Sequence, residues 1–280
     1  MANVTSLRNP SSLTDEAQLR VDLAAAFRMA AHLGWHEAVA NHFSLAVSPD
    51  GKKFLMNPKA RHFARIKASD LLLLDSDDKE TMNRPGAPDA SAWCIHGHLH
   101  ALVPHARCVL HVHPPYATAL ACLSDPEIKP IDQNTARFYN RVAIDLEFGG
   151  IADNDAEGER LARMLRNHKR MMMGNHGVLV VAETVAEAFH DLYYLERACQ
   201  TLVLAYSTGQ TLNTMPPEIA ERTAQGWLDY EGSRLCTLRR DESDTRRGGS
   251  ILRPVTFRYR RSSATVRCRH WCLRWEASRP

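Results

Sequence analysis

The spacing of apolar residues predicts a helix near the start of the chain, followed by strands. The helix is indicated by apolar residues at helical spacing, namely Leu19, Leu23, Phe27, Ala30 and Leu33. Gly34 stands where this helix should end, because glycine commonly follows the last helical residue. Residues 42–48 and 53–57 flank Pro49-Asp-Gly51 and are predicted to form a hairpin, and residues 71–75 a short buried strand.

The second half of the body continues this mixture of helices and hairpins. A helix is predicted over 91–101, with His96 and His100 four apart on one face, and it leads into a strand that begins at Cys108. An amphipathic helix over 155–165, a strand pair within 171–181 and a long helix over 185–208 follow. Because strand and helix do not alternate strictly, the pattern favours a layered α/β (α+β) fold with helices over a mainly antiparallel central sheet.

Composition points to one soluble domain without a membrane segment. The 280 residues, 44% of them hydrophobic, suffice for one substantial core. No apolar run approaches the roughly 20 residues of a membrane helix, and residues 1–15 lack the apolar core of a signal peptide. We therefore expect a cytoplasmic protein. Four cysteines in apolar segments, namely Cys94, Cys108, Cys122 and Cys199, are expected to be buried free thiols.

Charge is distributed unevenly along the chain. The net charge of +3 combines a C-terminal segment from Arg239, with twelve arginines, no lysine and four acids, and a body with a net charge of −5. A body of that sign gives no reason to expect nucleic-acid binding. The arginine-rich segment has no helical or strand periodicity. It is typical of a solvated, poorly ordered extension, and an RNA-binding or membrane-binding arm is the alternative.

Two histidines end the predicted strand that begins at Cys108. His111 and His113 are alternate residues, so they share one face of the strand about 6.6 Å apart, a span that one metal ion with bonds of about 2.1 Å can bridge. Pro114 and Pro115 cannot continue a central strand, so the pair lies at a strand-to-loop boundary, where ligands often bind. A third histidine, His176, interrupts the apolar run 171–181 between small and polar residues.

Two interpretations of these histidines remain open from spacing alone. A histidine beside a strand is usually a packed, hydrogen-bonded side chain, and a His-x-His pair can arise by chance among fourteen histidines. Three histidines with a glycine-rich break at the third are instead typical of a three-coordinate metal site with an open, catalytic position.

Several short segments together resemble the class II aldolase/adducin head domain family, in particular its adducin-like bacterial branch. The resemblance covers Thr14 to about Arg239. The segments, in the order of the family, are Asn41-His-Phe-Ser44, Met56-Asn-Pro-Lys59, Ser91-Ala-Trp93, His111-Val-His113, Asn175-His-Gly177 and Leu195-Glu-Arg-Ala-Cys199. Fuculose-phosphate aldolase and ribulose-phosphate 4-epimerase have this fold.

The resemblance implies a class II aldolase-like domain over 14–239, preceded by a flexible N-terminus, 1–13, and followed by a basic, disordered tail, 240–280. It implies Zn²⁺, or another divalent ion such as Mn²⁺, held by His111, His113 and His176. It also implies a homotetramer with active sites at subunit interfaces and a small-molecule substrate. The candidate substrate-binding residues are Asn41, Lys59, Ser91 and Asn175.

One departure from the family concerns its catalytic carboxylate. In the aldolases an acidic residue precedes the tryptophan that matches Trp93, and here Ala92 occupies that position. Alanine cannot carry a proton, so the usual base is missing. Asp89, about one helical turn upstream, is a possible substitute, although an aspartate that caps the helix is the more common case.

A second departure concerns phosphate binding. Alanines and a lysine stand at positions where sugar-phosphate enzymes have small and hydroxyl residues, namely Ala40, Lys59, Ala60 and Ala90. The phosphate site is therefore in doubt. Lys59 and Arg61 could instead bind a carboxylate, or could simply decorate a basic hairpin edge.

These features favour a metal-dependent carbon–carbon lyase, a decarboxylase or an aldolase-type enzyme acting on a small hydroxy or oxo acid. Such cleavage leaves negative charge on carbon, which a cation can stabilise without prior removal of a proton. A proton donor is still needed, and His96 is the candidate, with Tyr139 as the alternative; a structural role for His96 is equally open. Two other functions remain: a sugar-phosphate aldolase or epimerase with a relocated base, and a non-catalytic, adducin-like assembly domain.

Overall fold

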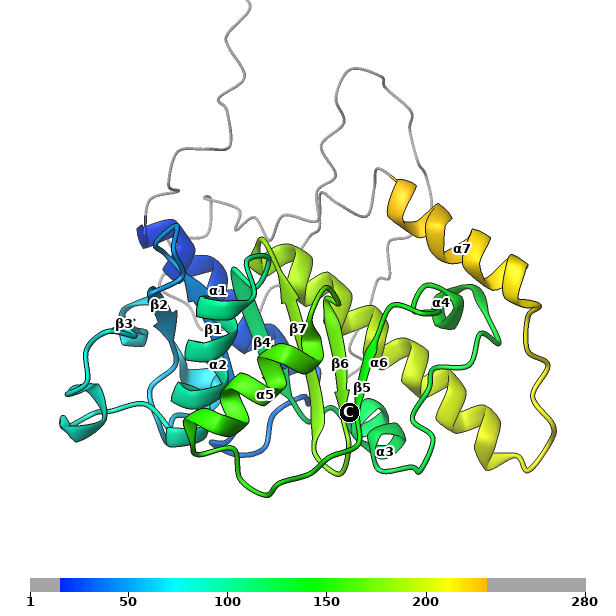
Figure 1. Ribbon diagram of the computed structural model, residues 1–280, viewed down its shortest axis with the longest axis horizontal. Coiled ribbons are helices and arrows are strands. Elements are labelled where there is room, and N and C mark those ends of the chain that lie inside the picture. Colours follow the sequence, from blue (N-terminus) through cyan, green and yellow to red (C-terminus); the bar gives the residue numbers. More distant parts are fainter. Residues whose placement is uncertain (1–15, 231–280) are drawn as a thin grey trace, which may run out of the picture.

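The computed structural model describes residues 16–230, which form one seven-stranded sheet with helices on both faces (Figure 1). The strand order is β3-β2-β1-β4-β7-β6-β5. The strands are β1 (His42–Ala46), β2 (Lys53–Met56), β3 (Leu72–Asp75), β4 (Cys108–Val112), β5 (Ala143–Asp145), β6 (Arg170–Met173) and β7 (Gly177–Ala182). All neighbours are antiparallel except β5 and β6, which are parallel. The predicted fold, a mainly antiparallel sheet flanked by helices, is confirmed.

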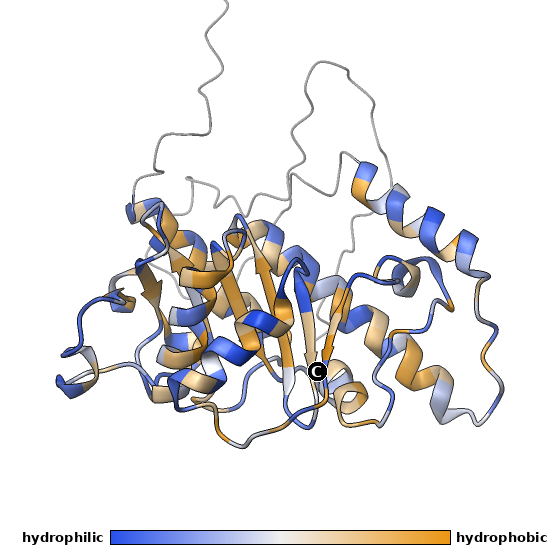
Figure 2. Cartoon of the chain, viewed as in Figure 1, coloured by the Kyte–Doolittle hydropathy of each residue, from blue (hydrophilic) through white to orange (hydrophobic). Residues whose placement is uncertain are grey.

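The helices form two layers that enclose the sheet. Helices α1 (Glu16–His32) and α6 (Val185–Ser207) cover one face, and α2 (Ala90–Leu102) and α5 (Asp155–Leu165) cover the other (Figure 1). The remaining helices are α3 (Pro115–Ala121), α4 (Gln133–Ala136) and α7 (Pro217–Asp229), with 3-10 turns at Phe63–Arg65, Ala68–Asp70 and Thr81–Asn83. Figure 2 shows the apolar strands between helices whose outward faces are polar.

Each face of the sheet has its own apolar core. On the α1 side the rings of Phe27 and Phe43 stack with centroids 4.7 Å apart, and Phe63 packs edge-on against Phe27 and at a tilt against Phe43. On the α2 side Val109 and Leu179 pack among the apolar residues of α2 and α5. Complete burial of a side chain of this size contributes about 1.5–3 kcal/mol, so both layers stabilise the sheet.

The elements predicted from apolar spacing are present, and shorter ones were missed. The strand predicted to be buried at 71–75 is wrong in its burial, because β3 is an edge strand with Leu73 47% exposed. Helix α1 ends at His32, and Gly34 adopts a left-handed φ of +75°, as expected of a residue that terminates a helix. Strand β5 and helices α3, α4 and α7 were not predicted. The expectation of four buried thiols is wrong for Cys122, which is exposed because it follows the last residue of the short helix α3.

The order of the central strands positions the histidines. β1 and β4 are antiparallel neighbours, and His42 lies directly opposite His111. β7 flanks β4 on its other side, so the turn that leads into β7 lies beside the end of β4. Pro114 and Pro115 then begin α3, which has proline in its first turn.

No helix between residues 16 and 230 is long and apolar enough to cross a membrane. The predicted flexible N-terminus, 1–13, and the basic tail, 240–280, lie outside the residues that the structure describes.

Candidate metal centre

The three histidines singled out in the sequence come together in the folded chain. One ring nitrogen from each of His111, His113 and His176 lies within 4.8 Å of the others. His111 is buried, with 1% of its surface exposed, while His113 and His176 are half-buried. The cluster therefore lies at the end of β4 with one side open.

Hydrogen bonds fix the ring orientation of two of these histidines. His111 Nδ1 donates to the carbonyl oxygen of Val178, 3.1 Å away. His113 Nδ1 lies 2.6 Å from the carboxylate Oε2 of Glu37, to which it donates. Because each Nδ1 carries the proton, each Nε2 has a free lone pair. A carboxylate or carbonyl behind a ligand histidine is the usual support of protein metal sites.

The Nε2 atoms of His111 and His113 are 3.2 Å apart. With both protons on Nδ1, no hydrogen lies between these atoms, so their lone pairs converge without a hydrogen bond. A tetrahedral ion with bonds of about 2.1 Å holds two ligand nitrogens about 3.4 Å apart. The observed separation therefore fits a divalent ion.

The backbone of the turn between β6 and β7 restricts the position of His176. Asn175 has a left-handed φ of 54°, and its N–H donates to Ala121 O. A Cβ atom added to Gly177 would lie 2.4 Å from Cδ2 of His113 and 2.8 Å from the backbone oxygen of Val112. Only glycine allows β7 to pass this close to the ligand ring.

Burial keeps two of the clustered histidines, His111 and His176, neutral. It holds the pKa of His111 well below its usual range, and the neighbouring His176 acts in the same direction. Burial, followed by the effect of His113, lowers the pKa of His176 to about 4. Neutral imidazole is the form that binds metal ions, so both rings are ready to act as ligands near neutral pH.

His96, the predicted catalytic residue, lies behind the cluster and not at its open side. It is completely buried on α2, and its Nε2 is 2.9 Å from His42 Nδ1. The ring of His42 stacks on that of His111, with centroids 5.0 Å apart. His96 therefore connects α2 to β1, and it reaches the metal centre through His42.

Tyr139, the alternative proton donor, follows α4. Its N–H donates to Ala136 O and its carbonyl accepts from Arg141. Helix α4 packs against α6 and α7, and in Figure 1 it lies away from α3, which begins at the end of β4. Within one chain, therefore, no contact in the described region joins Tyr139 to the three histidines.

Asn41 and Ser91, two of the four candidate substrate-binding residues, adjoin His42, and Lys59 is linked to Ser91 through Asp89. Asn41 precedes His42 with a φ of 70°, and its buried Oδ1 has no hydrogen-bond partner among residues 16–230. Ser91 Oγ is 3.4 Å from His42 Nε2. Lys59 is exposed and lies 3.4 Å from Asp89, which also binds Ser91. The fourth residue, Asn175, is exposed beside His176.

Ala92, which stands where the aldolases have a catalytic carboxylate, lies in apolar surroundings. Ala92 is 2% exposed and belongs to a cluster with Phe54, Met56 and Leu74. Asp89 caps α2 by accepting from the N–H of Ser91, as expected of a capping aspartate. Burial acts to raise the pKa of Asp89, but the hydrogen bonds from Ser91 and the nearby Lys59 outweigh it and lower the pKa.

Sequence reasoning missed Glu37, His42 and Phe148. Phe148 is half exposed, and its ring centroid lies 6.0 Å from that of His176, so it forms an apolar wall beside the cluster. The alternation of His42 and Ser44 on one strand face was a readable signal, since polar residues there needed partners. Glu37 and Phe148 lie in irregular segments, where apolar spacing carries no information.

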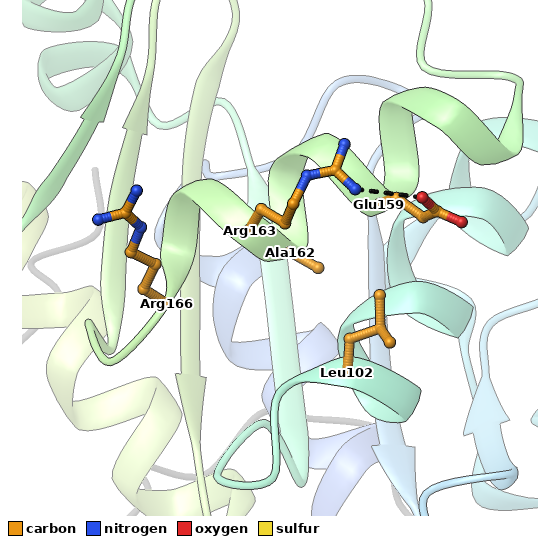
Figure 3. Close-up of a pocket in the computed structure, with 5 residues that line it drawn as sticks. All are labelled: Leu102, Glu159, Ala162, Arg163 and Arg166. Carbon is orange, nitrogen blue, oxygen red and sulfur yellow. Dashed lines mark hydrogen bonds and ion pairs between the residues drawn. The ribbon is translucent and has the colours of Figure 1, made fainter.

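A surface hollow of about 590 Å³ lies elsewhere, between the end of α2 and α5. Figure 3 shows Leu102 on α2 facing Ala162 on α5, with Glu159 paired with Arg163 on α5. None of the three clustered histidines lines it. It is therefore separate from the metal centre.

The chain is similar in sequence and fold to several known proteins. A putative aldolase class 2 protein of Caulobacter vibrioides is 32% identical over 206 residues, which cover 74% of this chain and 79% of the relative. The decarboxylase NovR of Streptomyces niveus is 28% identical over 233 residues, covering 80% and 86%. The solved structure of L-fuculose 1-phosphate aldolase from Glaciozyma antarctica has a TM-score of 0.65 at 26% identity, covering 78% of this chain and 86% of that chain.

Residues 21–203 match the family described as the Class II Aldolase and Adducin N-terminal domain. This match spans more than half of the chain, and it includes β1, β4, β7 and the three clustered histidines. The chain belongs to the class II aldolase and adducin family.

Proposed function

We propose that this protein is a divalent-metal-dependent carbon–carbon lyase, of the decarboxylase or aldolase type, that acts on a small hydroxy or oxo acid in the cytoplasm. His111, His113 and His176 hold the ion, which is Zn²⁺ or a similar cation such as Mn²⁺.

The observation that carries the proposal is the convergence of three imidazole nitrogens without a carboxylate. The group of potential ligands consists of three histidines and, within residues 16–230, contains no Asp or Glu. Three protein ligands leave a position for substrate, which is the arrangement of catalytic sites rather than of closed structural sites.

A bound divalent ion would act as a Lewis acid for the electron pair released by carbon–carbon cleavage. The chain's own residues hold the ligand rings: Glu37 orients His113, and Val178 orients His111. Ala92 offers no proton acceptor where the aldolases have a carboxylate. This favours cleavage reactions that do not begin by removing a proton from carbon, such as loss of carbon dioxide or of an aldehyde.

The carbon that remains after cleavage must take up a proton. His96 and Tyr139 are our candidates for this role. His96 is linked to the metal centre by His42, whereas Tyr139 would have to act from a neighbouring subunit, because within one chain it lies with α4. Asn41, Lys59, Ser91 and Asn175 are proposed to bind the substrate's polar groups.

Similar proteins that are named as a decarboxylase or an aldolase support a lyase. The 28% identity to a decarboxylase favours loss of carbon dioxide. The structural likeness to an L-fuculose 1-phosphate aldolase, at 26% identity, favours a sugar-phosphate aldolase as the second candidate.

A product screen tests the proposal and separates the two candidates. Metal-loaded protein is incubated with a panel of small hydroxy and oxo acids and with L-fuculose 1-phosphate, and the release of carbon dioxide or aldehyde is measured. We expect turnover of an acid at about 1–1,000 per second, and loss of that turnover in His176→Ala. Turnover of the sugar phosphate alone would favour the second candidate, and equal turnover by wild type and variant would contradict both.

We also propose that the chain forms a homotetramer. On α6, Tyr193, Leu204 and Tyr206 are 39%, 52% and 38% exposed, and this apolar surface is available to a second subunit. Light scattering tests this directly. A stable monomer with full metal content and activity would contradict an active site at a subunit interface.

A further inference from the structure

A row of buried polar side chains runs from the metal centre into the protein. It consists of His42 and Ser44 on β1 and of His96 and His100 on α2, the helix that packs against β1 (Figure 1). All four are 7% exposed or less. Buried polar groups without partners are costly, so the hydrogen bonds among these four determine how each ring is protonated.

The inner end of the row determines which atom donates in each of its hydrogen bonds. His100 Nδ1 lies 2.7 Å from the carbonyl oxygen of Ala106, and a carbonyl can only accept. The proton of His100 is therefore on Nδ1, and its Nε2 is an acceptor. Ser44 Oγ lies 2.7 Å from that Nε2, so the single hydroxyl proton of Ser44 points to His100.

The hydrogen bonds between Ser44 and His42 are donated in the same inward direction. Ser44 has used its proton, so His96 Nδ1, 2.5 Å away, must donate to Ser44 Oγ. His96 Nε2 is then an acceptor, and His42 Nδ1, 2.9 Å away, donates to it. In a neutral ring this leaves Nε2 of His42 without a proton. His100, at the inner end of the row and away from the clustered histidines, is neutral because burial lowers its pKa to about 4.

At the outer end of the row, Nε2 of His42 receives no hydrogen bond from any donor in the described part of the chain. Ser91 Oγ, 3.4 Å from His42 Nε2, donates its proton to Asp89, which is closer at 2.7 Å. The ring of His42 stacks on the metal ligand His111 at 28° with centroids 5.0 Å apart. A hydrogen-bond acceptor is thus left facing Ser91, next to the ligand set.

We propose that His42 is a specificity-determining residue whose Nε2 accepts a hydrogen bond from a hydroxyl group of the acid bound at the histidine cluster, and that Ser44, His96 and His100 are positioning residues that hold this tautomer. This inference rests on the proposed function for the location of the substrate. It names the substrate class more closely, as a hydroxy acid whose hydroxyl group is free.

The fixed tautomer of His42 also determines which ligand groups bind poorly beside it. An acceptor nitrogen beside the Asp89 carboxylate offers no proton to a phosphate or a second carboxylate, and both anions need donors. A hydroxyl group, in contrast, supplies the missing proton. Sites that must satisfy a buried polar group discriminate strongly against ligands that lack its partner.

The tautomers can be measured without substrate. Nitrogen-15 NMR of the histidine rings in the full-length protein near neutral pH distinguishes protonated from unprotonated ring nitrogens. We expect the proton on Nδ1 in His42, His96 and His100. Ser44→Ala should remove this uniform pattern, because the hydroxyl group that transmits the direction is lost, whereas His98→Gln, on the same helix but outside the row, should leave it unchanged. A proton on Nε2 of His42 in the wild type would overturn the inference.

Ligand selection is measured on the metal-loaded protein with 2-hydroxypropanoate and 2-methoxypropanoate. Both compounds carry the same carboxylate and an oxygen on the adjacent carbon, but only the first can donate a hydrogen bond. Calorimetry should show that His42→Phe reduces the preference for the hydroxy acid by about fivefold to tenfold, with metal content unchanged. An unchanged preference in His42→Phe, or in a milder His42→Ala variant should the first not fold, would overturn the inference.

The two measurements separate this inference from the proposed function. The expected tautomers and ligand preference in a protein that releases neither carbon dioxide nor aldehyde would refute the lyase and leave the role of His42 intact. Turnover of an acid by a protein without the expected tautomers or preference would refute the role of His42 alone.

Discussion

Glu37 Oε2 lies 2.6 Å from Nδ1 of His113, although 76 residues separate them in the chain. The carboxylate fixes the proton on Nδ1 and increases the basicity of the nitrogen that faces the cluster. We expect Glu37→Gln to weaken metal binding by about tenfold, and Glu37→Ala by up to about a hundredfold, with the fold intact. Competition with a metal-binding dye measures both. Glu218→Gln, on α7, is the matched control; an equal loss in the control would contradict a specific role for Glu37.

Gly177 allows β7 to pass the His113 ring, and this predicts a second effect. In Gly177→Ala the new Cβ would lie 2.4 Å from the ring and 2.8 Å from a backbone oxygen, so the ring or the strand must shift. We expect a loss of about 1–3 kcal/mol in unfolding free energy, together with weaker metal binding. Urea denaturation measures the loss in unfolding free energy.

Gly226→Ala is the control for this substitution, because a Cβ there meets nothing within 4 Å. Alanine in an exposed helix should stabilise α7 by up to about 1 kcal/mol. Similar losses in both variants would mean that the contact with His113 is unimportant.

The buried histidines predict a specific loss of stability in acid. Burial lowers the pKa of His100 from 6.5 to about 4 in the folded protein. Below pH 6.5 the unfolded chain therefore binds a proton that the folded chain does not, so stability falls between pH 6.5 and about 4 and no further below that. This single group accounts for a loss of about 3 kcal/mol.

His100→Phe should reduce the number of protons taken up on unfolding by about one between pH 6.5 and about 4. The measurement is urea denaturation of metal-free protein at a series of pH values, in which the slope of unfolding free energy against pH gives the number of protons. The same slope in wild type and variant would show that His100 does not titrate in this way.

Asp191 on α6 forms ion pairs with two buried arginines. Its Oδ1 accepts from Arg137 at 2.9 Å, and its Oδ2 accepts from Arg170. Asp191→Asn leaves both guanidinium groups without their negatively charged partner, so we expect a loss of about 3–5 kcal/mol in thermal or urea unfolding. Glu159→Gln, which breaks an exposed pair with Arg163, should change stability by less than about 1 kcal/mol. A loss for Asp191→Asn as small as this control would contradict a structural role of the cluster.

The histidine cluster could be predicted from sequence because its information is local. His111 and His113 are alternate residues on an apolar strand, and period-two spacing fixes their common face without knowledge of the rest of the fold. His176 stood out because it interrupts a second apolar run. The neighbouring hairpin and the long helices were predicted for the same reason, since their apolar residues recur at a constant spacing.

The residues that support the cluster depend on contacts between distant segments. The role of His42 follows from its register against His111 and from the packing of α2 on β1, neither of which apolar spacing encodes. The short helix α3 was missed in the same way. Its first N–H groups, on Tyr116 and Ala117, donate to the carboxylate of Glu196, about 80 residues later in the chain.

The most direct test of the account is the metal content of purified wild type and of a variant in which His111, His113 and His176 are all alanine. Elemental analysis after removal of loosely bound ions should find about one divalent ion per wild-type chain and none in the variant, while circular dichroism shows that both are folded, because an open catalytic site contributes less to folding than a closed one. A full complement of metal in the triple variant, or a wild-type protein that binds no divalent ion at micromolar concentrations, would contradict the account.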